Sequence, residues 1–236
     1  MKVTRRQFWF FWAAALASLV AVALFPVSNR LTRSATVLLA LGVWVGFLPL
    51  MWRRKRVRLG WLLMTVVGLG VLFYPARGRL DQLVLRQDYA ASLQRYRGVK
   101  FSWGGQNFRG MDSPGLVRRG LVDALFYRGL RSLRPELVRY ALWLWWTDCS
   151  ASDLAAGFLT IHQWDTASLN ELEHVRVRPG DLAVAVRGEH VLAYLGDQVW
   201  IEADPEVGRV ITVSAPSSQN EWFRKRMRIM RWRILD

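Results

Sequence analysis

Three long apolar runs without a charged residue occupy the first third of the chain and constrain its fold more than any other feature. They extend over residues 8–27, 34–52 and 60–76. A helix needs about 20 apolar residues to cross the hydrocarbon core of a bilayer, and a soluble core does not require three such runs in succession. A cleaved signal peptide is excluded because the first run is long and two more follow it. We therefore predict that residues 1–79 form a membrane anchor with three transmembrane helices.

The charge of the chain is divided in the same way. The formal net charge is +15, yet no Asp or Glu precedes Asp81, whereas twelve Lys and Arg do. The residues from 80 onward carry 21 basic and 18 acidic side chains. A basic excess on a compact domain would suggest a nucleic-acid partner. Here the excess lies in the anchor, so we expect a lipid bilayer as partner and no nucleic acid.

The basic residues also predict an orientation. Three of them precede the first apolar run, five lie at positions 53–58 between the second and third runs, and two, Arg30 and Arg33, lie between the first and second. Cytoplasmic loops carry the excess of Lys and Arg, which places the N-terminus and residues 53–58 in the cytoplasm. With three spans, residues 80–236 then lie outside the cytoplasm, in the periplasm if the membrane is a bacterial inner membrane.

The extramembrane part has helices first and strands afterwards. Apolar periodicity predicts helices over residues 80–96, 113–125, 135–146 and 150–159, followed by a polar connection. Short β-branched or alternating runs then predict strands over residues 182–186, 190–195, 199–203 and 210–213. The tail, residues 226–234, alternates basic with apolar residues and is typical of a last strand with one face in water. This order indicates an α+β domain over residues 80–236, with helices packed on an antiparallel sheet.

A glycine-rich loop precedes the predicted helix at 113–125. Trp103-Gly104-Gly105 is typical of a loop, and Asp112-Ser113-Pro114-Gly115 opens the helix with Ser113 as its N-cap and Pro114 in the first helical position. The backbone N–H groups of residues 114–116 could bind an oxyanion, except at Pro114, which has none. On these residues alone, Ser113 is either a nucleophile or only part of a helix cap.

Two further residues complete a catalytic arrangement. His190 begins one predicted strand and Glu202 lies on the next, so a hairpin turn near Gly196 would bring the two side chains together. A nucleophile, a base and a polar group that orients the base are the parts needed for acyl transfer. We predict Ser113, His190 and Glu202 as the catalytic residues.

The order of these motifs resembles the NlpC-type cell-wall peptidases, which are papain-like cysteine hydrolases that cut peptidoglycan stem peptides. The resemblance covers roughly residues 85–234 and rests on four blocks. They are Trp103-Gly104-Gly105, Asp112-Ser113-Pro114-Gly115-Leu116-Val117, Pro179-Gly180-Asp181-Leu182 and His190-Val191-Leu192-Ala193-Tyr194-Leu195-Gly196-Asp197, with Glu202 as the third polar position. It implies a papain-like fold, an amide substrate in the cell envelope, no cofactor, and substrate-binding roles for Phe101, Trp103, Gly104 and Asp112.

The chain departs from the family pattern at the nucleophile. Ser113 stands where the family has cysteine, and a thiol with a pKa of about 8.5 becomes a nucleophilic anion far more readily than a hydroxyl. Phe101 stands where the family often has an aromatic hydroxyl. The resemblance therefore implies either a hydrolase with weak activity or a pseudoenzyme that binds peptidoglycan or a partner protein without cutting it.

Cys149, the single cysteine, is the alternative nucleophile. Asp148-Cys149-Ser150 imitates the family's nucleophile motif, and a helix start at residue 150 would favour a thiolate. It lacks the preceding Gly-Gly loop, so a buried or capping role is favoured.

The remaining polar candidates have weaker patterns. His162 and His174 lie in polar connections without a ligand at metal-binding spacing, so both are expected at the surface and no metal site is predicted. Arg118 and Arg119 are expected on the solvated face of their helix, with one of them facing a ligand carboxylate as the alternative. The sequence does not predict an oligomeric state.

Overall fold

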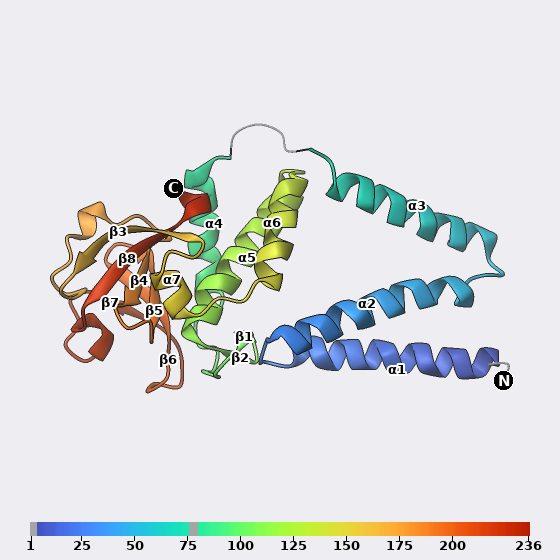
Figure 1. Cartoon of the computed structure of the whole chain (residues 1–236), viewed down its shortest axis with the longest axis horizontal. Coiled ribbons are helices and arrows are strands. Elements are labelled where there is room, and N and C mark those ends of the chain that lie inside the picture. The colour runs from blue at the N-terminus through green and yellow to red at the C-terminus, as the bar shows by residue number, and fades with distance from the viewer. Residues whose placement is uncertain (1–3, 76–79) are drawn as a thin grey trace.

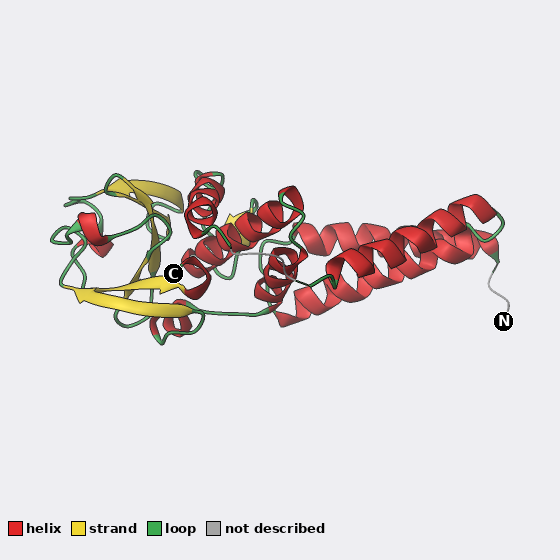
Figure 2. Cartoon of the chain, turned by 90° about the horizontal axis from the view of Figure 1, so that it is seen from above, coloured by secondary structure: helices red, strands yellow, loops and turns green. Residues whose placement is uncertain are grey.

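The computed structural model describes residues 4–75 and 80–236, apart from the side chain of Arg5. The end of the third apolar run at Ala76 and the predicted boundary between residues 79 and 80 therefore lie outside the described residues. The chain forms an elongated molecule with three long helices at one end and an α+β domain at the other (Figures 1 and 2).

The three N-terminal helices are α1 (Arg5–Leu24), α2 (Arg30–Leu50) and α3 (Lys55–Leu72). Helices α1 and α2 pack as an antiparallel hairpin, whereas α3 diverges from α2 (Figure 1). Among the described residues, Arg6–Leu24 and Arg30–Leu50 are long and apolar enough to cross a membrane. Helix α3 does not meet that test, because it begins inside the basic cluster. Two candidate spans are thus present in the structure, and the third stays a prediction.

The remainder of the chain is an α+β domain, as the sequence predicts. Its α-helices are α4 (Gln82–Gln94), α5 (Ser113–Arg131), α6 (Pro135–Trp146) and α7 (Ala151–Ala155), joined by the short 3₁₀ helices η1 (His174–Arg176), η2 (Glu221–Phe223) and η3 (Arg233–Leu235). Its strands are β1 (Gln106–Asn107), β2 (Gly110–Met111), β3 (Thr160–Thr166), β4 (Leu182–Ala185), β5 (Val191–Gly196), β6 (Val199–Asp204), β7 (Arg209–Ser214) and β8 (Met227–Trp232).

Six strands form one antiparallel sheet in the order β3-β8-β4-β5-β6-β7. The predicted meander from residue 182 to 213 is confirmed, and its hairpin turn lies at Gly196–Gln198, where three successive residues have positive φ. Strand β3 occupies a segment that was predicted to be a polar connection. All its residues but Thr160 are exposed or half-buried, because β3 is an edge strand, and so its sequence lacks an apolar pattern.

The prediction for the C-terminal tail is wrong in one respect. Strand β8 lies inside the sheet between β3 and β4, and it has no solvated face. Its basic residue Arg231 is buried because the guanidinium forms a bidentate ion pair with Asp181, at 2.6 and 2.8 Å. Internal ion pairing therefore accounts for Arg231, whereas Arg226 and Arg233, before and after the strand, are exposed.

Apolar side chains cover both faces of the sheet. On one face, α5 packs with α4 and α6 against residues such as Val191, Ala193, Ile201 and Ala203. On the other face, Leu192, Tyr194 and Trp200 pack against the segments around residues 169–177 and 215–223. Since successive side chains of a strand point to opposite faces, Glu202 belongs to this second face.

Candidate catalytic site

The start of helix α5 is fixed by Asp112. Asp112 is the N-cap, so the helix begins one residue earlier than predicted. Ser113 is its first residue and Pro114 its second. The two carboxylate oxygens of Asp112 accept hydrogen bonds from the backbone N–H groups of Gly115 and Gly104, each at 2.7 Å. Burial raises the pKa of this carboxyl, whereas the two backbone hydrogen bonds oppose that shift. Asp112 thus holds the glycine loop to the helix, and the hydroxyl of Ser113 is not used for capping.

The glycine loop contacts the helix start so closely that a side chain would not fit. A Cβ atom on Gly115 would overlap the carbonyl oxygen of Gly105, and one on Gly105 would lie 2.5 Å from the carbonyl carbon of Gly110. Gly104 has φ of +70°, a conformation that favours glycine. These three glycines allow the loop to lie directly against the first turn of α5.

The backbone donors of the first turn are distributed differently from the prediction. The N–H of Gly115 donates to the side chain of Asp112, and the N–H of Leu116 donates to its carbonyl oxygen. Pro114 has no N–H. The N–H of Ser113 donates to no group within residues 4–75 and 80–236. The expected oxyanion donors at 114–116 are therefore engaged or missing, and the donor left available belongs to Ser113 itself.

His190 and Glu202 lie together, as their positions on neighbouring strands predict. Nε2 of His190 lies 2.6 Å from Oε2 of Glu202. The other carboxylate oxygen of Glu202 accepts a hydrogen bond of 2.5 Å from the side-chain amide of Asn220. The ring of Trp222 stacks on the imidazole with the centroids 4.1 Å apart and the planes at 11°. Both catalytic candidates are buried, and each is held on two sides.

This arrangement selects one form of the imidazole. Because a carboxylate oxygen accepts, the proton of neutral His190 resides on Nε2, and Nδ1 keeps its lone pair. Nδ1 makes no hydrogen bond within the part of the chain that the structure describes. A buried histidine with one nitrogen fixed by a carboxylate and the other available is the arrangement expected of a general base.

Ser113 is not joined to this pair by a hydrogen bond. Its side chain is only 4% exposed, and its hydroxyl makes no hydrogen bond to any of the described residues. Helix α5 packs on the sheet face opposite Glu202, so the hydroxyl and the imidazole can meet only around the end of the sheet where His190 precedes β5. Helix α7 lies near both the start of α5 and the turn before His190. It contacts the turn before His190, where a Cβ on Gly188 would lie 2.6 Å from Cα of Ser152, and it borders a cavity that Pro114 also lines.

The predicted substrate-binding residues have different surroundings. Trp103 is 74% exposed at the tip of the glycine loop and lies edge-on to Phe101, with the ring centroids 5.0 Å apart. Phe101 packs partly into the core, and its N–H donates to the carbonyl of Gly208. Of the four predicted residues, Trp103 therefore offers its side chain to a ligand most directly, whereas Phe101 and Asp112 support the loop.

Cys149 is buried, and burial raises the pKa of its thiol to about 11. A thiol with such a pKa is protonated at neutral pH, and the protonated form is not the nucleophile. The helix that follows, α7, is capped by Ser150. It has five residues and is therefore shorter than the predicted helix over residues 150–159. These findings oppose a nucleophilic role for Cys149.

The residue before this cysteine has a structural role that the sequence did not suggest. Asp148 accepts from Arg118 at 2.9 Å and from Arg33 at 3.2 Å, and Arg118 also donates to the carbonyl of Thr147. The prediction of a solvated Arg118 is wrong, because this pairing buries it. Arg119 bonds Tyr96 and Asp123 instead.

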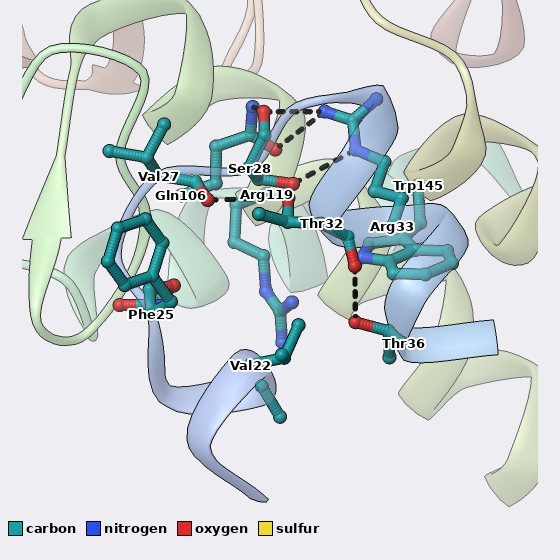
Figure 3. A pocket seen from close by; sticks show the side chains of 12 residues that line it. Val22, Phe25, Val27, Ser28, Thr32, Arg33, Thr36, Gln106, Arg119 and Trp145 are labelled. Atoms are coloured by element: carbon teal, nitrogen blue, oxygen red, sulfur yellow. Dashed lines mark hydrogen bonds between the residues drawn. The ribbon is translucent and has the colours of Figure 1, made fainter. Parts of the chain in front are cut away.

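Arg33 connects the N-terminal helices to the α+β domain. Its guanidinium is buried and donates to Ser28 and Gln106 (Figure 3). It also donates to Asp148 and to the carbonyl of Trp146. The residues before it continue the contact. The N–H of Ser28 donates to Gly104, and Val27 pairs with Gly105 in an isolated β-bridge. The segment between α1 and α2 therefore lies directly on the outer side of the glycine loop.

This contact creates two cavities beside the start of α5. One, of about 830 Å³, is lined by residues 27–31 from the connection between α1 and α2 and the start of α2, by Asp112, Pro114 and Gly115, and by residues 148–150 and 153. The other, of about 230 Å³, lies between α1, α2 and the domain (Figure 3). Neither Ser113 nor His190 lines either cavity. The larger cavity reaches the glycine loop and Cys149, so residues 27–31 form one wall of the space next to the start of α5.

The other histidines do not form a metal site. His162 is exposed on β3 and pairs with Asp165 at 2.8 Å. His174 is half-buried and accepts a hydrogen bond from the indole of Trp200 at 3.2 Å, and burial lowers its pKa. The prediction of a surface residue is thus correct for His162, whereas His174 is partly exposed and partly covered by Trp200 and Tyr194. No cluster of three His, Cys, Asp or Glu suited to a metal occurs among the described residues.

Comparison with known proteins gives structural likenesses only. No protein-family model matches the chain, and no curated protein matches it. One similar solved structure is the P60 domain of an antigen from M. avium subspecies paratuberculosis, which is 18% identical, with 66% of this chain and 99% of that chain covered and a TM-score of 0.42. Another is the peptidoglycan hydrolase RipB from Mycobacterium tuberculosis, which is 18% identical, with 80% of this chain and 86% of that chain covered and a TM-score of 0.42. A third is an NlpC/P60 family protein from Bacillus cereus, which is 14% identical, with 69% and 42% covered and a TM-score of 0.42.

Proposed function

We propose that this chain is a membrane-anchored, NlpC-type amide-hydrolase domain that acts on peptidoglycan stem peptides or related amide bonds in the cell envelope. The observation that carries the proposal is the buried hydrogen bond between Nε2 of His190 and Glu202, supported on its far side by Asn220. Pairing buried polar groups adds little net stability to a fold. A buried carboxylate that fixes the tautomer of a histidine is therefore better explained by a role of that histidine as a base than by a stabilising role.

The three catalytic candidates have distinct roles in this proposal. The hydroxyl of Ser113 attacks the amide carbonyl while Nδ1 of His190 takes its proton. The resulting imidazolium gives that proton to the leaving amine as the C–N bond breaks, which leaves the acyl group as an ester of Ser113. A water molecule, deprotonated by His190, then hydrolyses this ester and restores the hydroxyl. Glu202 holds the ring and stabilises its charge. The N–H of Ser113 would donate to the oxyanion that forms on the carbonyl oxygen.

A second function is favoured by the surroundings of Ser113. Ser113 is 4% exposed as a residue and its hydroxyl makes no hydrogen bond to any described residue, and a serine stands where the resembling family has cysteine. In this alternative the domain is a pseudoenzyme that binds a peptidoglycan peptide or a partner protein without turnover. Both alternatives use the same surface, and we propose the degenerate hydrolase with low turnover as the first of them.

The anchor is part of the proposal. We infer that α1, α2 and α3 all cross the inner membrane of a bacterium, with residues 1–79 as anchor and 80–236 as the periplasmic domain. The contacts agree with this topology, because the α1–α2 connection and the end of α3 both touch the domain, through Arg33 and through bonds from Arg139 to Leu72 and Tyr74. The basic residues at 53–58 lie at the opposite ends of these helices, where the positive-inside rule places the cytoplasm.

The test is hydrolysis of purified muropeptides by the full-length chain in detergent or nanodiscs, because the anchor forms part of the cleft wall. We expect slow amide cleavage that falls by about 10²–10⁴-fold in Ser113→Ala and in His190→Gln. We also expect faster cleavage in Ser113→Cys, since a thiol is more readily activated by an imidazole.

Matched controls separate the site from its surroundings. Ser214→Ala removes an exposed hydroxyl and His162→Gln an exposed imidazole, so neither should change the rate. Binding of muropeptide without cleavage in every variant, Ser113→Cys included, would support the pseudoenzyme instead. Cleavage that disappears only in Cys149→Ala would refute the assignment of Ser113.

A further inference from the structure

One face of helix α6 is apolar and uncovered. Leu142, Trp143 and Trp146 are 46%, 45% and 49% exposed. Together with Arg139 they lie at spacings of three and four residues, which places all four on one side of the helix. The opposite side of α6 carries Leu137, Ala141 and Leu144, which are buried in the core. The helix therefore has one apolar face for α5 and a second apolar face that no described residue covers.

Helix α6 is bonded to the anchor helices at two places, and both contacts are at the ends of those helices that lie beside the domain. Near its end, the carbonyl of Trp146 accepts from Arg33, in the first turn of α2, at 3.1 Å. Near its middle, Arg139 donates to the carbonyl of Tyr74 at 2.9 Å and to that of Leu72, where α3 ends. Helix α6 thus runs from the start of α2 to the end of α3, across the direction of these helices rather than along it (Figure 1).

The exposed face points to the side where α3 ends. Arg139 belongs to the same face as Leu142 and Trp143, and it is this side chain that reaches the last carbonyls of α3. Whatever surrounds the end of α3 therefore also meets the two exposed tryptophans.

We propose that this face of α6 lies in the headgroup region of the membrane that the anchor crosses, with lipid as its occupant. The inference rests on the proposed membrane anchor and does not require the domain to be catalytically active. Tryptophan and leucine on one face of a short helix are typical of segments that lie in the bilayer interface. Residues 131–146 carry three arginines and one acidic residue, Glu136. Such a charge balance suits contact with lipid phosphates.

The proposal also predicts the height of the candidate site above the membrane. A helix that lies flat on the membrane, bonded at two points to the spans, would fix the height of the domain above the bilayer. The glycine loop and the start of α5 contact the α1–α2 connection directly. The candidate site would therefore open close to the membrane surface.

The test is the membrane depth of a spin label on full-length protein in vesicles of phosphatidylethanolamine and phosphatidylglycerol. Cys149→Ser removes the native thiol, and labels are then placed at Trp143→Cys or, as a second site on the same face, Leu142→Cys. Collision rates with oxygen, which concentrates in lipid, and with a water-soluble nickel chelate report the depth. Leu38→Cys in α2 is the lipid control, and Val175→Cys on the distant η1 is the water control.

We expect the labels at 142 and 143 to be several-fold better protected from nickel than the label at 175, and less protected than the label at 38. Equal nickel access at 143, 142 and 175, with 38 protected, would overturn the proposal while leaving the anchor intact. Nickel access at 38 as well would refute the anchor and the proposal together. Spin–spin broadening at 143 that persists on dilution with unlabelled lipid would identify a second copy as the occupant and would also overturn the proposal.

Discussion

Asp181, in the turn before β4, allows a quantitative prediction about what holds the domain together. Its carboxylate receives both arms of the Arg231 guanidinium, and Arg86 lies beside it at 3.8 Å. Asp181 and both arginines are buried. The hydrogen bonds that Arg231 donates to Asp181 raise the pKa of Arg231, whereas burial lowers the pKa of Arg86. Asp181→Ala would leave two buried cations facing each other without their counter-charge.

The size of the effect follows from this geometry. Removing one partner of a buried ion pair destabilises a protein by about 3–5 kcal/mol. Arg231 keeps a contact of 3.2 Å with the more exposed Asp236, so we expect the lower value, about 3 kcal/mol. For a domain of this size 1 kcal/mol shifts the midpoint of thermal unfolding by about 2–4 °C. The expected loss is therefore about 6–12 °C, measured by near-ultraviolet circular dichroism of the full-length protein in detergent.

A matched substitution and a double variant test the reasoning. Asp165→Ala removes a carboxylate that pairs with His162 and Arg226 at the surface, and exposed pairs contribute about 0–1 kcal/mol. Arg231→Met combined with Asp181→Ala should recover part of the loss, because the uncompensated charge is removed as well. A shift for Asp181→Ala no larger than that for Asp165→Ala would refute the account of this ion pair.

Three further predictions concern the surroundings of the candidate site. Alkylation of Cys149 should be slow at pH 8 and should rise about tenfold per pH unit up to a pKa of about 11, because burial stabilises the protonated thiol; a rate that levels off below pH 9 would contradict this. Gly115→Ala should destabilise the domain by about 1–3 kcal/mol in thermal unfolding, because the new methyl group overlaps the carbonyl of Gly105. Arg33→Ala should speed hydrogen exchange at the N–H of Ser28 by tenfold or more, since the α1–α2 connection loses the buried hydrogen bonds that Arg33 donates to Ser28.

Each of the last two substitutions has a control in a helix: Gly68 in α3 for Gly115 in α5, and Arg30 for Arg33, both in α2. Gly68→Ala in α3 adds a methyl group with nothing within 4 Å, and stability should not fall. Arg30→Ala removes an exposed charge at the start of α2, and exchange at Ser28 should not change. An equal effect of Arg30→Ala and Arg33→Ala would show that the buried hydrogen bonds are not the cause.

The strand and helix pattern of the domain could be predicted because its periodicity is strong. The hairpin that joins His190 and Glu202 followed from alternating runs with a Gly-Asp turn between them, and the structure confirms that the two side chains bond. Strand β3 could not be found in the same way, since an edge strand with exposed side chains has no apolar alternation to detect.

Long-range partners were beyond prediction for a different reason. Asn220, which holds Glu202, and Trp222, which covers His190, lie in a polar turn whose sequence does not say where it packs. Arg33 and Arg118 carry charges that a sequence reader places in water, and the structure buries them because Asp148 and several carbonyl groups meet them. The pairing of such charges depends on which segments fold together, and local sequence does not contain that information.

The proposed catalytic unit depends on whether residue 113 faces the free nitrogen of His190. The most direct measurement is the pH dependence of alkylation of Ser113→Cys in a Cys149→Ser background, with and without His190→Gln. A thiol beside an imidazole should titrate well below its ordinary pKa of about 8.5, and His190→Gln should return it to that value or above. Identical titration in the two variants, at 8.5 or higher, would mean that the two groups do not meet and would contradict the account.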